Sequence, residues 1–352
     1  MLPRAAARLQ GVDAARGLAV LGMMAAHTWP RGAEPAELLV DGRPSVLFAV
    51  VAGVALGLIS GGDAPPTADR GRARARLALR AVLLLIAGVL LWMLPSGIAI
   101  ILDAYGLLFL LLVPLLFAGR ALLAATAAAL LVTAPLVRDR VVDLTGLGPS
   151  GPITAADAGS LALDWLLTGY YPVLLWLPLL LAGLLVARSG LQHRRVRLLM
   201  LGLGATASLA GYGAAAVLPD VDATAHSGTT AELLGAGGLA IAIIGGALLL
   251  LDSPRKPRAV ALAGAPLAAL GRVALTVYVG HVVVIALLEP LGPAGLFEPA
   301  VGIPLLIVLA IAGITLGLVC DRLGRRGPLE AALACTIDAA LPRRGPSARL
   351  GA

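Results

Sequence analysis

The chain has 352 residues, of which 59% are hydrophobic and only 13% charged, and its formal net charge is +7. Soluble globular domains carry about 25% charged and 45–50% apolar residues, so this composition excludes that class. The basic residues fall in short segments between apolar blocks and form no basic domain with interleaved aromatic residues, which argues against a nucleic-acid partner.

Long apolar blocks bounded by charged residues, Gly and Pro recur along the whole chain. A hydrocarbon core needs about 20 mostly apolar residues per helical span, so each block predicts one transmembrane helix. The predicted fold is therefore all-α, a polytopic helical bundle in the lipid bilayer. Ten spans are predicted, at 12–30, 44–61, 78–96, 100–118, 121–137, 170–187, 198–218, 234–251, 266–288 and 302–320.

The first span carries polar residues on a single helical face. Asp13, Arg16, Val20, Met23 and His27 are spaced by three or four residues, so they share one face. Arg16 and His27 are separated by about 16 Å along a helix that rises about 1.5 Å per residue. No small-residue cleavage site follows, which predicts a retained span. Polar residues inside spans indicate function; the alternative is that Arg16 is a topology signal paired with Asp13, and His27 an interfacial residue.

Later segments carry further polar residues on the same predicted side of the membrane as His27. Asp103 lies at the outer end of the fourth span. His226 follows in an outer loop of Gly and small hydroxyl residues, which suits a loop that folds over a pocket mouth; an ordinary solvated histidine is the alternative. His281 lies in the outer half of the ninth span, three residues after Tyr278. An imidazole there is expected to bond to a neighbouring span, in a functional or a structural role.

Two long segments outside the spans differ in character. The outer loop at about 138–169 is polar and rich in Gly, Asp and Thr, and loops of this length often carry function. The C-terminal segment 328–352 contains an amphipathic stretch around Leu329–Leu341 that is too short to span, so we expect a helix along the inner surface. This divides the chain into a membrane domain at 1–327 and a cytoplasmic tail at 328–352.

The distribution of basic residues predicts the orientation. If the N-terminus is cytoplasmic, every inner loop is basic, whereas the outer loops hold only Arg31, Arg43, Arg138 and Arg140. Both termini are then cytoplasmic. Lys256 is the single lysine among 27 basic residues, and Ala, Gly and Pro are abundant. That skew is typical of a GC-rich bacterial genome, so we expect a multi-pass protein of the bacterial plasma membrane.

The segment Gly11–His27, GVDAARGLAVLGMMAAH, resembles the first span of the heparan-α-glucosaminide N-acetyltransferase-like membrane proteins, in a bacterial branch of the transmembrane acyltransferases. An Arg and a His with ten residues between them are also similar to the bacterial membrane O-acyltransferases. The resemblance extends from about residue 8 to residue 285. Further similar stretches follow in order: Gly42–Ala49, Ala104–Phe109, Gly169–Trp176, His226–Thr229 and Gly271–Tyr278.

This resemblance implies a membrane-bound acyltransferase with acyl-CoA, in particular acetyl-CoA, as co-substrate. The sequence contains no metal-binding motif of useful specificity, so no metal is expected. The lysosomal enzyme that names the family has its catalytic histidine in the loop after the first span. Here that loop, Thr28–Gly42, contains no histidine, so His27 is the candidate in its place. The expected acceptor is a hydroxyl or amine of a glycan or lipid at the outer face, and a homodimer stays open.

In this hypothesis the phosphates of acyl-CoA bind inner-face arginines, Arg16 first, with Arg80 and Arg272 as helpers, because an Arg fork suits phosphate geometry. A neutral His27 acts as general base on the acceptor, or is acylated first.

Other residues complete the predicted site. Asp103 is the candidate that orients His27, with His281 and His226 as alternatives. Asp13, Arg43 and Tyr278 are the remaining members of the predicted set.

Two other classes of protein compete with the enzyme. A permease for a small anion or sugar would use the same buried Arg and His residues without covalent chemistry. Against it, the sequence shows no corresponding pair of Gly/Pro-interrupted spans in two halves, the usual pointer to a transporter site. In a structural or regulatory membrane protein, the outer histidines would be packing residues.

Overall fold

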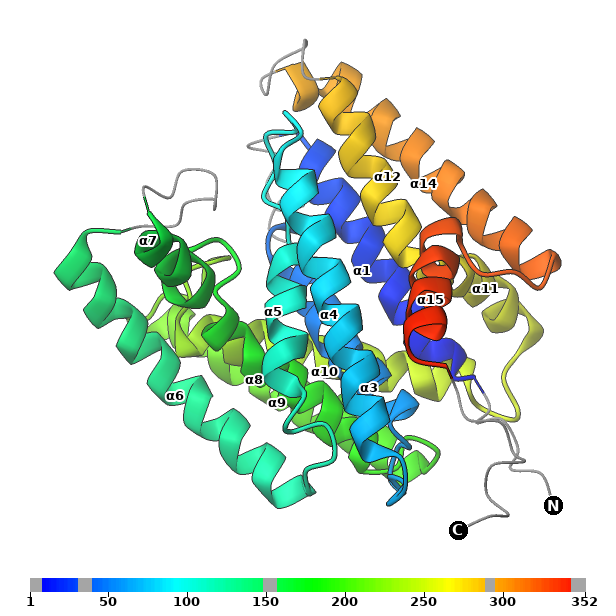
Figure 1. The fold of residues 1–352 in the computed structure, drawn as a ribbon, viewed down its shortest axis with the longest axis horizontal. Helices are drawn as coiled ribbons and strands as arrows, with labels where there is room; N and C mark the ends of the chain where they lie inside the picture. The colour runs from blue at the N-terminus through cyan, green and yellow to red at the C-terminus, as the bar shows by residue number, and fades with distance from the viewer. Residues whose placement is uncertain (1–7, 31–39, 148–156, 289–294, 343–352) are drawn as a thin grey trace.

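The computed structural model describes residues 8–30, 40–147, 157–288 and 295–342, and the regular structure in these ranges is entirely helical (Figure 1). This confirms the all-α prediction. The helices are α1 Gln10–Thr28, α3 Arg43–Ile59, α4 Arg70–Trp92, α5 Leu102–Leu112, α6 Arg120–Thr145, α7 Ala158–Leu163, the π-helix η2 Asp164–Thr168, α8 Val173–Arg188, α9 Arg194–Val217, α10 Thr230–Leu251, α11 Arg258–Arg272, α12 Ala274–Leu287, α14 Pro299–Arg322 and α15 Pro328–Ala340.

Within the described residues, five helices are long and apolar enough to cross a membrane, namely α4, α6, α9, α10 and α14. Two bent pairs meet the same criterion together, α7–η2 with α8 and α11 with α12, which raises the number of candidate spans to seven. The three other predicted spans coincide with α1, α3 and α5, which do not meet it alone. The membrane helical bundle is thus confirmed, and the count of ten spans stays a prediction.

Two of the predicted spans are broken. The ninth, predicted as one helix at 266–288, is instead α11 and α12, which meet at Val273 with a bend of 73°. The sixth begins earlier than predicted, as α7 and η2, and bends by 42° before α8. Gly169 and Pro172 lie at that second break, where Pro lacks the N–H that a continuous helix needs.

The prediction of an outer loop at 138–169 was wrong over most of the part that the structure describes. Helix α6 continues through the charged residues to Thr145, and α7 and η2 occupy 158–168. The charges end the apolar pattern but not the helix, because Arg and Val remain compatible with helical backbone. Arg138 on this extension donates a hydrogen bond to the backbone carbonyl of Ser227, so α6 supports the loop before α10.

Helix α1 lies in the middle of the bundle, while α6 and α14 form opposite edges (Figure 1). It contacts α3, α10, α11, α12 and α14. The contact with α11 is especially close: a Cβ on Gly17 would lie 2.0 Å from the carbonyl oxygen of Leu267, and one on Gly271 would lie 1.9 Å from that of Asp13. Small residues allow this backbone approach in membrane helices, and it brings the end of α11 against the start of α1.

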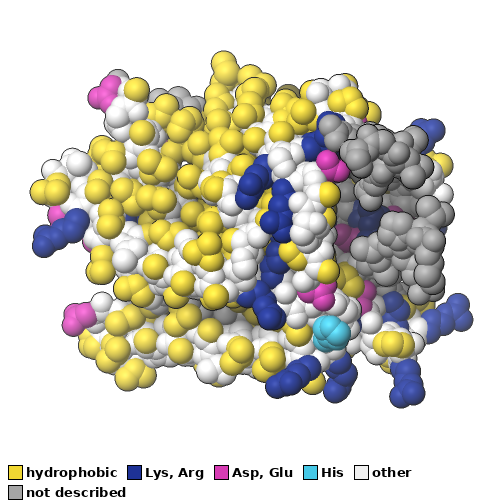
Figure 2. All heavy atoms as spheres, turned by 60° about the horizontal axis from the view of Figure 1, so that its bottom comes forward, with side chains coloured by type: hydrophobic (Ala, Val, Ile, Leu, Met, Phe, Trp, Pro, Cys, Tyr) yellow, Lys and Arg dark blue, Asp and Glu magenta, His cyan; other side chains and the backbone are white. Residues whose placement is uncertain are grey.

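Two buried arginines at the end of the bundle where α1 begins have structural roles. Arg188 donates to the carbonyl oxygens of Gly57 and Leu116 at 3.1 and 2.6 Å and to Ser60 Oγ at 2.7 Å. Arg197 donates to the carbonyl oxygens of Leu191 and Leu248. These guanidinium groups donate to carbonyl oxygens near the C-terminal ends of helices, where the helix dipole favours a positive charge. Figure 2 shows Lys and Arg side chains gathered in a band beside broad apolar surfaces.

Candidate functional site

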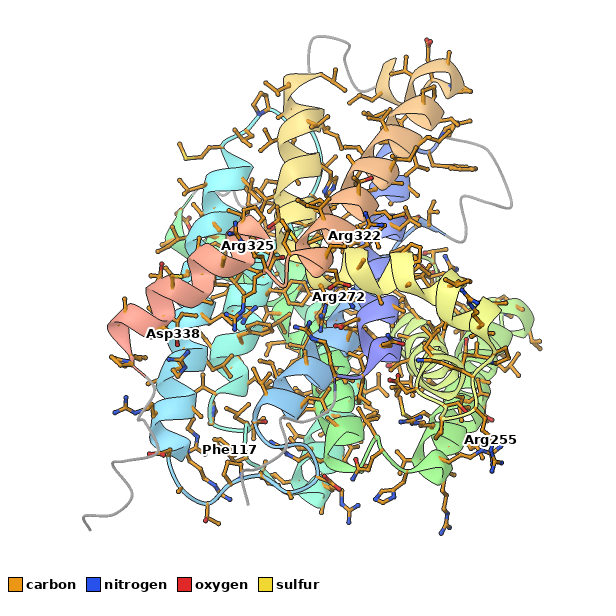
Figure 3. All side chains as sticks on the ribbon, turned by 90° about the vertical axis from the view of Figure 1, so that its right-hand side faces the viewer. Phe117, Arg255, Arg272, Arg322, Arg325 and Asp338 are labelled. Atoms are coloured by element: carbon orange, nitrogen blue, oxygen red, sulfur yellow. The ribbon has the colours of Figure 1, made fainter. Side chains whose placement is uncertain are left out.

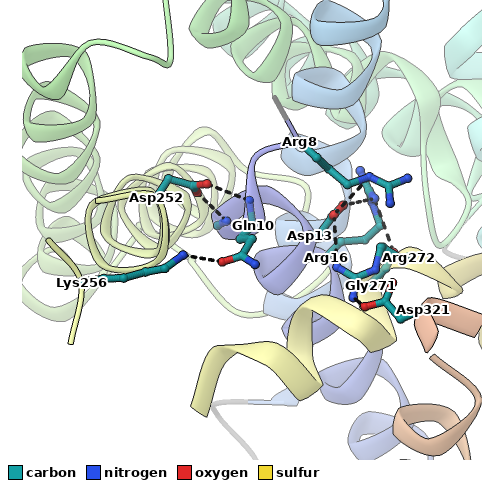
Figure 4. A network of polar contacts seen from close by, with 10 residues as sticks. Arg8, Gln10, Asp13, Arg16, Asp252, Lys256, Gly271, Arg272 and Asp321 are labelled. Carbon is teal, nitrogen blue, oxygen red and sulfur yellow. Dashed lines mark hydrogen bonds and ion pairs between the residues drawn. The ribbon is translucent and has the colours of Figure 1, made fainter. Parts of the chain in front are cut away.

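The start of α1 is held by a residue distant in sequence. Leu9 at the N-cap provides no side-chain hydrogen bond, and the Asp252 carboxylate instead accepts from the N–H groups of Gln10 and Gly11 at 2.9 and 2.7 Å (Figure 4). Lys256 donates to Gln10 Oε1 at 2.6 Å. An acidic cap satisfies free N–H groups and complements the helix dipole, so α1 has a defined position from its first residue.

One turn further, Asp13 connects three arginines (Figure 4). Its Oδ1 accepts from Arg16 Nη1 at 3.1 Å, and its Oδ2 lies 3.8 Å from Arg272 Nη1 and 3.9 Å from Arg8 Nε. Arg272 also pairs with Asp321 at the end of α14. The structure therefore brings together Asp13, Arg16 and Arg272, which the sequence analysis predicted as site residues.

Arg80, the third predicted donor-binding arginine, lies near this group. On α4 it is half-buried and within electrostatic range of Arg16, Arg326 and Glu330. No hydrogen bond or ion pair joins Arg80 to another described residue. We call Arg8, Arg16, Arg80, Arg272 and Arg326 the arginine cluster. Its guanidinium groups outnumber the nearby carboxylates, so it could hold an anion.

Helix α15 packs beside the arginine cluster. The Glu330 carboxylate accepts from Leu275 N–H at 2.7 Å and from Thr276 N–H and Oγ at 3.1 and 2.6 Å, which caps α12. Arg76 on α4 pairs with Asp338 at 2.5 Å. Figure 3 shows Arg272, Arg322 and Arg325 near the place where α11, α14 and α15 meet. The predicted tail helix thus exists and packs on the bundle; residues 343–352 lie outside the described part.

At the opposite end of α1, His27 and His281 form a pair. His27 Nδ1 lies 3.0 Å from His281 Nε2, and the ring planes are nearly parallel, with centroids 5.3 Å apart and 8° between the planes. His281 is 1% exposed, while His27 is half-buried. In such a bond one imidazole donates and the other accepts, so the pair shares a single proton along the contact. We call these two residues the histidine pair.

Tyr278 fixes the buried side of the histidine pair. Its ring packs edge-on against His281 with centroids 5.1 Å apart, and its hydroxyl accepts a hydrogen bond from Ile101 N–H at 3.1 Å. Ile101 directly precedes α5, so this contact ties α12 to the start of α5. Tyr278, a predicted site residue, therefore supports the imidazole that contacts His27.

Asp103 does not have the partner that was predicted. Its Oδ2 accepts from Trp92 Nε1 at 3.1 Å and from Trp165 Nε1 at 2.8 Å. Asp103 was predicted to orient His27, with His281 and His226 as alternatives; of these three residues, His281 makes the hydrogen bond with His27. The sequence could not indicate the two indole donors, because Trp92 and Trp165 lie on other elements and reach Asp103 only through tertiary packing.

His226 belongs to a separate aromatic group. Its backbone has φ of +61°, and its ring packs against Tyr170, Tyr171 and Trp176 with centroid distances of 4.9, 5.5 and 6.5 Å. The buried carboxylate of Glu232 accepts from His226 N–H at 2.6 Å. A left-handed non-Gly residue persists only where its surroundings hold it. His226 is thus firmly positioned, on a different set of contacts from the histidine pair.

Arg43 lies beside the loop that carries His226. Its guanidinium is 5.1 Å from the ring centroid of Tyr212, a cation–π geometry, and Nη1 donates to the carbonyl oxygen of Asp41 at 3.2 Å. A Cβ on the preceding Gly42, whose φ is +65°, would lie 2.7 Å from the Cβ of Ala225. The start of α3 therefore packs directly against the His226 loop.

The fold, the arginine cluster and the histidine pair define a class of protein. It is a multi-pass helical membrane protein in which the central helix α1 carries polar residues at both ends. Among known families, the one described as "Heparan-alpha-glucosaminide N-acetyltransferase, catalytic" matches residues 8–216, more than half of the chain. The chain belongs to this family of transmembrane acyltransferases, and the description suggests a membrane acetyltransferase. A second family, "Protein of unknown function (DUF418)", matches residues 182–337. No curated protein matches the chain.

Several residues that shape the site were not predicted. Trp92 and Trp165 had no signal beyond the rarity of Trp, of which the chain has four. Glu232 did have one: Thr229-x-x-Glu232 is a capping-box pattern, and Thr229 Oγ accepts from Glu232 N–H at 3.1 Å. Asp252 and Glu330 cap helices distant in sequence, and no local pattern could have indicated that role.

Proposed function

We propose that the protein transfers an acyl group, most simply acetyl, from cytosolic acyl-CoA to a hydroxyl or amine of a glycan or lipid on the other side of a bacterial plasma membrane. One observation carries this proposal: the same helix, α1, has the arginine cluster at one end and the histidine pair at the other. The family match over residues 8–216 supports acetyl transfer as the chemistry.

The arginine cluster suits the phosphates of the donor. Arg80 has no hydrogen-bond or ion-pair partner among the described residues, and Arg16 has one close carboxylate, that of Asp13. Guanidinium groups bind phosphate oxygens through parallel N–H donors, and such charge-assisted bonds are about twice as strong as neutral ones. With the nucleotide end held there, the acyl arm follows α1 over the roughly 16 Å that separate Arg16 from His27.

The histidine pair suits proton transfer at the acyl carbon. His27 accepts the proton of the acceptor O–H or N–H while the oxygen or nitrogen bonds to the thioester carbonyl carbon. The C–S bond then breaks, and the CoA sulfur leaves and takes up a proton. The His281 imidazole, held by Tyr278, keeps the ring of His27 in one orientation. General-base catalysis of this kind contributes about 10²–10⁴-fold.

The test measures acceptor-dependent release of CoA from acetyl-CoA by purified protein in liposomes. We expect His27→Ala to lower the rate by about 10²–10⁴-fold, with unchanged protein level and elution volume. His193→Ala is the matched control, because His193 is exposed in a basic segment between α8 and α9. An unchanged rate for His27→Ala would overturn the proposal.

A permease remains a second candidate because of one structural observation. Two spans are broken, α7–η2 with α8 and α11 with α12. Interrupted spans of this kind were not apparent in the sequence. Transporters bind solutes at such discontinuous helices. Liposomes separate the two functions: the enzyme releases CoA only when acceptor is present, whereas a permease accumulates unmodified solute without acyl-CoA.

A further inference from the structure

A small pocket lies beside the start of α5, lined by residues from three segments. Asp103 contributes from α5, Trp92 from α4, and Asp164, Trp165 and Tyr170 from η2 and the segment after it. Its free volume is about 10 Å³, room for about one group the size of water. Tyr170 is 45% exposed, which places it at the mouth. The proposed reaction does not use this pocket.

The carboxylate of Asp103 is incompletely satisfied. The residue is 2% exposed; both indole N–H groups donate to Oδ2, and Oδ1 has no hydrogen-bond partner in the described part of the chain. Buried polar atoms are nearly always paired, and an unpaired one costs about 1–3 kcal/mol, more when charged. Asp103 also lies in the first turn of α5, where the helix dipole favours a negative charge. The pocket thus offers an anionic acceptor to a ligand.

The other lining residues select the kind of donor. Asp164 is a second carboxylate, 5% exposed, and Trp92, Trp165 and Tyr170 supply aromatic rings. None of the described lining residues is basic. Carboxylates surrounded by aromatic rings attract cations through charge and through the ring quadrupoles. A neutral hydroxyl would meet only the hydrogen-bonding requirement.

We propose that this pocket binds the primary ammonium group of an alkylamine, with one N–H donated to Asp103 Oδ1. An –NH₃⁺ group is close to water in size and has three N–H donors, whereas a quaternary ammonium is larger than the free volume and has none. A protonated amine has no free electron pair, so it is bound here and not acylated. The proposal does not depend on acyl transfer.

The test titrates purified protein in nanodiscs with ethylammonium chloride, without any acyl donor. Binding is followed by tryptophan fluorescence and calorimetry, because Trp92 and Trp165 line the pocket. We expect saturable binding of ethylammonium, and at least tenfold weaker binding of both ethanol, the neutral analogue, and tetramethylammonium, the larger cation. Equal affinity for ethanol or tetramethylammonium would overturn the proposal.

Variants locate the site. Asp103→Asn keeps the shape and removes the charge, and we expect at least tenfold weaker ethylammonium binding. Asp143→Asn, on the exposed end of α6, is the matched control and should bind like the wild type. If Asp103→Asn does not fold, Tyr170→Ala at the partly exposed mouth replaces it, with severalfold weaker binding expected. Wild-type affinity in the folded variant contradicts the proposal.

Discussion

The two ends of α1 accommodate polar side chains in a membrane protein in different ways. At the beginning, Asp13, Arg16 and Arg272 are charged groups that neutralise one another only in part, in a region where α11 and α14 end and α15 begins. At the other end, His27 and His281 are imidazoles that need no net charge to interact, and one hydrogen bond joins them.

This difference indicates what each end can bind. A surplus of guanidinium groups attracts a multiply charged anion over a distance, and this attraction weakens as the salt concentration rises. A buried imidazole pair attracts no ion strongly but can hold a proton at a defined atom. The arginine cluster is therefore suited to recognition and the histidine pair to chemistry, and separate variants at each end should change separate kinetic quantities.

After the loss of His27 itself, the largest expected effect comes from removing His281. His281→Ala deletes the imidazole that contacts His27 Nδ1, and we expect a fall of about 100-fold in the transfer rate, about 2.7 kcal/mol in activation free energy. The dissociation constant for acetyl-CoA should not change. His281→Gln retains a donor and an acceptor and should restore part of the rate.

Single-turnover kinetics with purified variants measure both quantities. If His281→Ala transfers at the wild-type rate while His27→Ala does not, the contact between the rings is packing only, and His281 has no positioning role.

The next effect should appear at the other end of α1, in binding and not in rate. Arg80→Ala removes a guanidinium that has no hydrogen-bond or ion-pair partner among the residues that the structure describes. We therefore expect a roughly tenfold weaker affinity for acetyl-CoA, about 1.4 kcal/mol, with kcat unchanged. Arg195→Ala, an exposed arginine at the start of α9, is the control. Titration at two salt concentrations should show that the difference narrows at high salt. A change in kcat with unchanged affinity would argue against a donor site at Arg80.

The sequence predicted the arginine end better than the histidine end. Arg16, Asp13 and His27 lie on one helix, so their spacing alone places them on a common face. Arg272 and Arg80 follow from the rule that basic residues gather on one side of the membrane, and the structure places both near Arg16.

The contact between His27 and His281 could not follow from spacing, because 254 residues separate them and the packing of α12 on α1 decides it. The same holds for the indoles on Asp103. The bend at Val273 was not predicted for another reason. Hydropathy reports the apolar length of a segment and contains no information on its direction, so α11 and α12 were predicted as one span.

A smaller effect is expected from the cap that positions α1 itself. Asp252→Ala removes the acceptor of two backbone N–H groups and should lower the free energy of unfolding by about 1 kcal/mol. Thermal unfolding in detergent measures this, with Asp143→Ala as the control. Since both ends of the site depend on α1, activity should fall only in proportion to the folded fraction. A loss of activity at full folding would show that the cap also sets the register of the site.

The smallest effect should come from the ion pair that attaches α15 to α4. Asp338 has a side chain 43% exposed, and exposed pairs contribute about 0–1 kcal/mol, so Asp338→Ala should shift unfolding by about 0.5 kcal/mol, less at high salt. The informative measurement is the affinity for acetyl-CoA, because α15 packs beside the arginine cluster. If α15 does not move when the donor binds, the affinity for acetyl-CoA is unchanged. If it must move for the donor to enter, weakening the pair raises the association rate while stability hardly changes, and the two ends of α1 then differ also in their access to solvent.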